Sequence, residues 1–251
     1  MNQSERKPNN KAGNPRNHIE DFGPLIVALG SKDKSVRGKA RESLLEIGEP
    51  STGALVKALS DPNGRVRFEA ATLLDQINVH WTRHADAETV EALASDLCSE
   101  DGLVRVRVRM ALVAIGAKAV DSLAGALKSK QEVCRWEAAK ALSQIRDHDA
   151  TGLLVKALED ESFGVRWLAS EGLIAIGNPA LVPLLSELVQ RPDSVWMREG
   201  VHRILHGIQR KGTARALRPL LNALEDAEAE LSVAFAAKAA LDELRNKQGT
   251  T

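Results

Sequence analysis

A pattern of about thirty residues recurs along this 251-residue chain and limits its fold more than any other feature. The clearest copy is DESFGVRWLASEGLIAIG, residues 160–177. Its apolar residues recur at steps of four, four and three, which is one stripe of a helix: Val165, Ala169, Leu173 and Ile176. Gly177 follows the stripe, where glycine often ends a helix in a left-handed conformation. This copy predicts a polar turn followed by a capped amphipathic helix.

The same helix is written seven times, each copy starting at an anchor residue of the apolar stripe. The anchors are Val36, Val66, Val104, Cys134, Val165, Trp196 and Val233, spaced by 30, 38, 30, 31, 31 and 37 residues. The position four residues later is mostly alanine, which lets neighbouring helices approach closely, and the position eight residues later is Leu or Ile. A second apolar segment precedes each copy. This period, with one helix pair per unit, predicts an all-α fold: an α-solenoid, or superhelix, of seven two-helix repeats.

The chain divides accordingly into a tail, one repeat domain and a short end. Residues 1–17 lack an apolar core and predict a disordered tail, not a signal peptide, and residues 247–251 are expected to fray. The predicted repeats within 18–246 are 18–48, 49–78, 86–116, 117–146, 147–177, 178–208 and 213–246. Gly48, Gly116 and Gly177 are predicted helix caps, with Asn78 as a substitute in the second repeat. Pro24, Pro183 and Pro219 occupy one slot in their first helices and predict a kink there. The last repeat is alanine-rich and lacks an arginine after its anchor, as an end cap would.

Composition narrows the function classes. The 34 basic and 34 acidic side chains cancel, whereas a protein that depends on phosphate contacts is usually basic. No apolar run approaches the ~18 residues of a membrane span. We therefore expect a cytoplasmic protein without a membrane partner, and a nucleic-acid partner only through a local basic patch.

The cysteines and histidines give no recognisable metal or redox motif. Cys98 and Cys134 lack the spacing of a metal or redox pair, and Cys134 at an anchor predicts a small buried thiol. Two His-x-x-x-His pairs occur, His80 with His84 and His202 with His206. The second pair lies on a predicted helix, where residues four apart can share a metal. Because neither pair has an evident third ligand, we expect polar surface histidines and neither a metal site nor a cofactor.

The repeated D-x-x-x-x-V-R-x-x-A-x-x-x-L-x-x-I-G resembles the HEAT-like repeat of the phycobilisome-lyase type. The resemblance covers roughly residues 20–246 and is carried best by residues 160–177 and 61–77. This family includes chromophore lyase subunits, a di-iron hydroxylase and many scaffolds, so the resemblance indicates fold more strongly than function. The hydroxylase relatives carry His-Glu dipeptides, which this sequence lacks, and their metal site is not carried over.

An arginine follows the anchor in five repeats: Arg37, Arg67, Arg105, Arg135 and Arg166. In repeats of this type, the resemblance implies, the arginine reaches an acidic group at the preceding turn and forms a ladder between units. The candidate acidic partners are Asp33, Asp61, Asp101 and Asp160. We interpret these arginines as structural.

The position two residues after the anchor points away from the apolar stripe and is expected to line a concave face. It holds Gly38, Phe68, Val106, Trp136, Trp167, Arg198 and Phe235. Trp136 and Trp167 are expected to be neighbours there. Two interpretations remain open: the rings anchor a partner, or they lie on the next helix as part of the stacking.

Basic residues gather on the early repeats, where Arg107 and Arg109 lie off the core stripe near Lys39, Arg41 and Arg65. Such a strip is suited to phosphates or an acidic protein. Acidic residues are interleaved with it, namely Glu42, Glu69 and Asp75, which favours a mixed solvated face.

We find no nucleophile elbow, Gly-rich phosphate loop or carboxylate pair of defined geometry. The sequence therefore favours a non-catalytic scaffold whose groove binds another protein, with apolar anchors Phe68, Trp136 and Trp167 and with Arg107, Arg109 and Arg198 steering acidic groups. The first alternative is a chromophore (bilin) lyase subunit or a related accessory protein. The second alternative, nucleic-acid binding, is less favoured because the charges balance.

Overall fold

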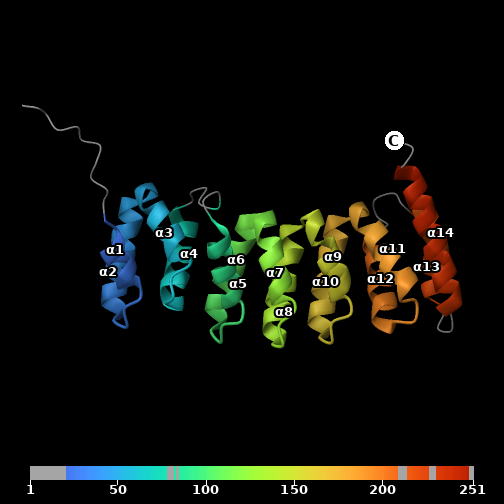
Figure 1. Ribbon diagram of the computed structural model, residues 1–251, viewed down its shortest axis with the longest axis horizontal. Coiled ribbons are helices and arrows are strands. Elements are labelled where there is room, and N and C mark those ends of the chain that lie inside the picture. The colour runs from blue at the N-terminus through green and yellow to red at the C-terminus, as the bar shows by residue number, and fades with distance from the viewer. Residues whose placement is uncertain (1–20, 78–81, 83–84, 209–213, 226–229, 249–251) are drawn as a thin grey trace, which may run out of the picture.

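A computed structural model shows a row of helix pairs that runs from one end of an elongated molecule to the other (Figure 1). It describes residues 21–77, 82, 85–208, 214–225 and 230–248. All regular structure in these residues is helical, which confirms the predicted α-solenoid. The predicted tail, Asn78 and the pair His80 and His84 lie outside the described residues.

Each repeat contains a first and a second helix. The first helices are α1 (Gly23–Leu29), α3 (Thr52–Ala58), α5 (Ala87–Asp96), α7 (Val120–Ala126), α9 (Thr151–Ala157), α11 (Leu181–Gln190) and α13 (Ala214–Leu224). The second helices are α2 (Lys34–Ile47), α4 (Gly64–Ile77), α6 (Gly102–Ile115), α8 (Glu132–Ile145), α10 (Phe163–Ile176), α12 (Val195–Ile208) and α14 (Glu230–Gln248). α14 continues two residues into the segment that was expected to fray.

Local sequence accounts for the helix ends. Asp33, Asp86 and Asp101 accept hydrogen bonds from amides in the first turn of α2, α5 and α6, as N-cap residues do. The bond from the Thr89 amide also lowers the pKa of Asp86. Gly48, Gly116 and Gly177 end α2, α6 and α10 at φ of 68°, 74° and 79°, as predicted. Arg146 ends α8 in the left-handed region without being glycine, at φ 57°.

The helices form two layers through most of the row. Each second helix contacts the next second helix, in the series α2, α4, α6, α8, α10 and α12. First helices likewise contact first helices; for example, α5 contacts α7 and α9 contacts α11. The residue four positions after the anchor is fully buried as Ala70, Ala138 and Ala169. These small side chains let adjacent second helices approach closely, so one apolar core extends along the molecule.

The last helix pair is turned over relative to the others. The second helix α14 packs on the first helix α11, and the first helix α13 contacts the second helix α12. A hydrogen bond from Arg245 in α14 to Ser186 Oγ in α11, 3.4 Å long, spans the same junction. The first-helix layer therefore ends in α14 and the second-helix layer in α13. The sequence shows only the longer spacing before the last anchor.

The predicted register of the sixth repeat is wrong by one residue. Trp196, the predicted anchor, is 40% exposed, whereas Met197 is fully buried, as are Val201 and Leu205 four and eight residues later. The second helices α2 to α10 begin two residues before their anchors, and α12 begins at Val195, two residues before Met197. The sequence misleads here because Trp196 is apolar and lies beside the true anchor.

The three prolines differ in where they stand in their helices, and the kink predicted at Pro219 stays a prediction. Pro24 lies in the first two residues of α1, and Pro183 is the third residue of α11. Proline is tolerated in a first turn because those amides have no intrahelical acceptor. Pro219 alone of the three stands inside its helix, α13. The predicted kinks at Pro24 and Pro183 are therefore wrong.

The two cysteines are joined in a disulfide, so Cys134 is buried as predicted but is not a free thiol. Cys98 follows α5 of repeat three, and Cys134 is the anchor of repeat four, 36 residues later. The same contact occurs between repeats one and two, where a Cβ on Gly30 would lie 2.9 Å from the anchor Val66. Repeat geometry therefore brings these two positions together, a signal that the linear cysteine spacing does not carry.

No single helix of the described residues is long and apolar enough to cross a membrane. Only when taken together are α10 and the segment Asn178–Gln190 long and apolar enough for a span, and they are bent by 118° where they meet.

Candidate interaction surface

The five ladder arginines share one contact. In each, Nη1 donates to a backbone carbonyl of the turn that precedes its own helix, as in Arg37 to Ser31 at 2.8 Å and Arg166 to Asp160 at 2.7 Å. Arg67, Arg105 and Arg135 repeat this bond. The carboxylates of Asp33, Asp61 and Asp101, which were expected to pair with the arginines, instead accept backbone amides in their own turns.

In most ladder arginines, the other guanidinium nitrogens, Nε and Nη2, reach the following repeat. Arg67 donates to Asp96 in α5, with Nε 2.5 Å from Oδ2. Arg135 donates to Asp160 at 2.8 Å and to Glu161 at 2.8 Å. The hydrogen bonds to Asp96 and Asp160 raise the pKa of Arg67 and of Arg135 above the ordinary value for arginine. These side chains join consecutive repeats, which is the structural role that the sequence suggests.

Trp136 is committed to packing. Its ring is half-buried against the core, and a Cβ on Gly164 of the next second helix would lie 3.0 Å from the ring atom Cδ1. Lys140 Nζ lies 4.7 Å from the ring centre. The Trp136 side chain of α8 thus packs against α10, in agreement with the second of the two interpretations left open by the sequence.

Three other aromatic rings form an exposed cluster on α10 and α12, which we call the aromatic patch: Phe163, Trp167 and Trp196. Their exposed fractions are 66%, 43% and 40%. Phe163 and Trp167 are one turn apart on α10, with ring centres separated by 5.9 Å. Sequence reasoning found Trp167 but missed Phe163, which it left in the turn, and Trp196, which it placed in the core.

Two arginines hold the aromatic patch together. The Arg166 guanidinium lies 4.5 Å from the Trp196 ring centre and 5.8 Å from that of Phe163. Arg203 of α12 lies 3.1 Å above the Trp167 ring and donates to Glu171 across the repeat junction. Cation–π contacts form within about 6 Å of a ring centre. The rings are therefore ordered by the arginines while large parts of their surfaces face solvent.

The predicted steering arginines do not form a common surface. Arg109 is only 11% exposed and is bound to Glu137 at 2.8 Å and to Gln144 at 2.9 Å, so it joins α6 to α8. Arg107 is partly exposed and lies 3.6 Å from Asp75. Arg198 follows the true anchor Met197 and so occupies the ladder position of repeat six. The contacts of Arg109 favour a structural role for that residue, and the binding role of Arg107 and Arg198 stays a prediction.

The other predicted positions lie apart from the aromatic patch. Phe68 is half-buried on α4, and Phe235 is 76% exposed on α14, which belongs to the first-helix layer. Arg41 pairs with the buried carboxylate of Glu69 at 3.4 Å. The basic strip of the early repeats is thus interleaved with acidic partners, as the sequence suggests.

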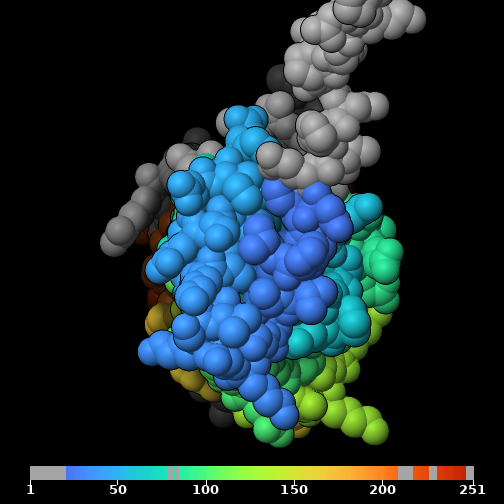
Figure 2. All heavy atoms as spheres, turned by 90° about the vertical axis from the view of Figure 1, so that its left-hand side faces the viewer, coloured from blue at the N-terminus to red at the C-terminus, as the bar shows by residue number. Residues whose placement is uncertain are grey.

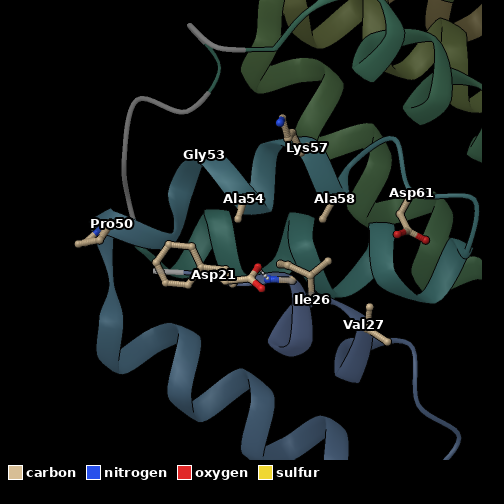
Figure 3. Close-up of a pocket in the computed structure, with 11 residues that line it drawn as sticks. Asp21, Ile26, Val27, Pro50, Gly53, Ala54, Lys57, Ala58 and Asp61 are labelled. Atoms are coloured by element: carbon tan, nitrogen blue, oxygen red, sulfur yellow. Dashed lines mark hydrogen bonds between the residues drawn. The ribbon is translucent and has the colours of Figure 1, made fainter. Parts of the chain in front are cut away.

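A groove of about 1070 Å³ opens at the N-terminal end of the row. Figure 3 shows Ile26 and Val27 of α1 opposite Ala54 and Ala58 of α3, with Lys57 pointing away from them. Seen from that end, α1 and α2 form the outermost surface (Figure 2). The groove is lined by residues of the first helices α1 and α3 and of the segments beside them, and nothing in the described residues indicates an occupant.

The pair His202 and His206 has a third neighbour that the sequence did not suggest. Their rings lie edge to face with centres 4.6 Å apart on α12. Glu225, the residue after α13, places Oε1 4.0 Å from His202 Nε2. The turned-over last repeat brings α13 beside α12 and so places a carboxylate near this pair, which the linear spacing does not indicate. The expectation of histidines without a metal stays a prediction.

The chain belongs to the HEAT-repeat family. The model of HEAT repeats matches residues 54–143, 89–165, 126–202 and 152–242, which together cover most of the chain. These matches span repeats two to seven and agree with the helix pairs described above.

Individual relatives are more distant. Deoxyhypusine hydroxylase of Drosophila melanogaster is 30% identical over 111 residues, covering 42% of this chain and 36% of that protein. The chain thus spans about a third of that relative's length. An engineered protein solved by the Northeast Structural Genomics Consortium is 25% identical over 76% of this chain and 97% of its own, with a TM-score of 0.45. A designed armadillo repeat protein is 19% identical, covering 88% and 98%, with a TM-score of 0.38.

Proposed function

We propose that this HEAT-repeat protein is a non-catalytic scaffold that binds another protein through the aromatic patch on α10 and α12. The observation that carries the proposal is the clustering of three large, partly exposed rings, Phe163, Trp167 and Trp196, across one repeat junction. Large aromatic residues and arginine are enriched at the energetic centres of protein interfaces.

The partner's chemistry follows from the groups that remain available. Exposed ring faces favour apolar side chains, and Arg166 keeps its charge between two rings while its Nη1 is bound to backbone carbonyls. We therefore propose a partner segment that offers apolar side chains beside a carboxylate. Because the rings are already ordered, binding loses little side-chain entropy.

The test compares the double variant Phe163→Ala/Trp167→Ala with wild type. Partners captured by cross-linking in cell extract are identified by mass spectrometry, purified, and titrated against each protein by calorimetry. We expect the double variant to bind at least about 30-fold more weakly, the loss of one interfacial hot spot of about 2 kcal/mol.

Two matched controls remove exposed apolar surface elsewhere. Val27 and Phe235 are each 76% exposed and lie at the two ends of the row, so Val27→Ala and Phe235→Ala should bind as wild type does. If the double variant remains folded by circular dichroism and binds every partner within twofold of wild type, the proposal is wrong.

We do not extend the metal-dependent oxidation of the hydroxylase relatives to this chain. The family resemblance assigns the di-iron centre of such relatives to His-Glu dipeptides, and this sequence contains none. The residues present therefore do not fit that group, and no oxidation step follows for this chain. No particular observation favours the bilin-lyase alternative. The nucleic-acid alternative is weakened by Arg41 and Arg107, which face Glu69 and Asp75.

A further inference from the structure

We propose that His202, His206 and Glu225 form a binding site for a divalent transition-metal ion of the zinc class, which joins α12 to α13. The site lies at the junction between repeats six and seven, apart from the aromatic patch. It combines two helical histidines with one carboxylate from the next repeat.

The backbone already presents the three side chains to one another. Residues four apart lie on the same face of a helix, which places His202 and His206 side by side on α12. Glu225 comes from the end of α13, which contacts α12 because the last helix pair is turned over. One ligand atom from each residue lies within 4.8 Å of the other two.

These distances are close to those of a bound ion. Zinc bonds nitrogen and carboxylate oxygen at about 2.0–2.2 Å, so tetrahedral donors are separated by about 3.4 Å. His202 Nε2 and Glu225 Oε1 are 4.0 Å apart. The Glu225 side chain is 62% exposed and can swing inward without disturbing the core. A small side-chain movement therefore completes the three-ligand set.

His202 Nε2 gives an independent reason to expect a ligand. This nitrogen is inaccessible to solvent and has no hydrogen-bond partner, although the side chain as a whole is 39% exposed. The 4.0 Å separation from Glu225 is too long for a hydrogen bond. A buried polar atom without a partner costs about 1–3 kcal/mol, and coordination of a metal removes that cost.

The donor set selects the class of ion. Imidazole suits zinc, copper, nickel and iron, whereas calcium and magnesium prefer sites built from oxygen. Two imidazoles and a carboxylate leave a fourth tetrahedral position that water can fill. Because the ligands come from two repeats, the ion would fix the angle at which the terminal pair docks.

A second cluster serves as the contrast. Asp147, His148 and Asp149 also lie close together. However, Asp147 caps the short helix His148–Ala150 by accepting the Asp149 amide at 2.8 Å. Its geometry is explained by local backbone structure, and all its donors come from three consecutive residues. His148 therefore provides the matched control for a non-specific histidine effect.

The test uses the full chain without a histidine tag, stripped with chelator and titrated with zinc chloride by calorimetry. We expect one equivalent to bind, and cobalt chloride to give the visible absorption of a tetrahedral site. Zinc at about 100-fold above its dissociation constant should raise Tm by about 5 °C.

Variants decide whether these residues are the ligands. His202→Ala, His206→Ala and Glu225→Gln should each weaken zinc binding at least about tenfold, whereas His148→Ala should bind zinc within twofold of wild type. Glu225→Gln removes only an exposed charge, so its result does not depend on refolding. No zinc uptake by wild type, or equal uptake by His202→Ala and Glu225→Gln, would overturn the proposal.

Discussion

At the scale of single residues, one residue type serves different purposes according to what surrounds it. Arg135 is 7% exposed, binds a backbone carbonyl of the turn before its own helix and reaches repeat five through Asp160. Arg107 lies on the surface, 3.6 Å from an exposed Asp75. Arg166 and Arg203 order aromatic rings. The sequence cannot separate these roles, because each depends on what the adjacent repeat contributes.

This contrast predicts unequal stability effects. Arg135→Ala leaves Asp160 without its charged partner at a repeat junction and should lower the free energy of unfolding by about 3 kcal/mol. Arg107→Ala removes an exposed pair and should lower it by less than about 1 kcal/mol. Urea denaturation followed by circular dichroism measures both. Equal effects of the two variants would contradict the structural role of the ladder.

At the scale of helices, close approach decides where glycine is needed. Gly172 lies inside α10 where a Cβ would stand 2.8 Å from Leu154 Cδ1 and 3.1 Å from Ser143 Cα. Gly38 lies inside α2 with nothing within 4 Å of such a Cβ. Gly38 stands two residues after its anchor and Gly172 seven residues after its own, so they lie on different faces of their helices. The packing of α8, α9 and α10 leaves no room for a Cβ at Gly172.

The two glycines should therefore respond in opposite directions. Gly38→Ala should stabilise the protein by about 0.5–1 kcal/mol, because alanine is the better helix former. Gly172→Ala should destabilise it by about 1 kcal/mol or more, because overpacking at Ser143 exceeds that gain. Paired thermal melts of the two variants measure the difference. A stabilising Gly172→Ala would show that α8 and α10 are further apart than described.

At the scale of the whole molecule, most repeats contact only their neighbours, so stability is a sum of local interfaces. The Cys98–Cys134 disulfide adds a covalent link between repeats three and four, near the middle of the row. Disulfides persist in oxidising compartments and are rare in the cytosol. A disulfide would be unusual at the predicted cytoplasmic location. The oxidation state of Cys98 and Cys134 in cells therefore tests that prediction of location.

The disulfide also makes a measurable prediction. Closing a loop of 36 residues should stabilise the folded chain by about 4 kcal/mol relative to the reduced form. Reductant should therefore lower Tm of wild type but not of the Cys98→Ser/Cys134→Ser variant. Thiol titration of the unfolded protein before and after reduction counts the bonded cysteines. Two reactive thiols before reduction would contradict the bond.

How far the sequence could predict the fold differs between elements. The stripe of residues 165, 169, 173 and 176 predicted α10, and Gly177 its end, because these signals act within one turn of helix. Trp196 misled the register of α12, since an apolar residue beside the true anchor satisfies the same pattern. The candidate sites were less predictable. Trp167 was found, whereas Phe163 was missed because the sequence places it in the turn before α10. Glu225 was missed because its neighbour His202 lies in another repeat.

The sequence by itself determined the helix pairs, their period and the order of the repeats, because amphipathic stripes and caps are local. Only the tertiary structure decided which way the last pair faces, since that choice depends on how α13 and α14 cover α11 and α12. The same docking places Glu225 beside His202, and the junction of α10 with α12 gathers the aromatic patch. Contacts between repeats are set by the geometry of stacking, which no single repeat contains.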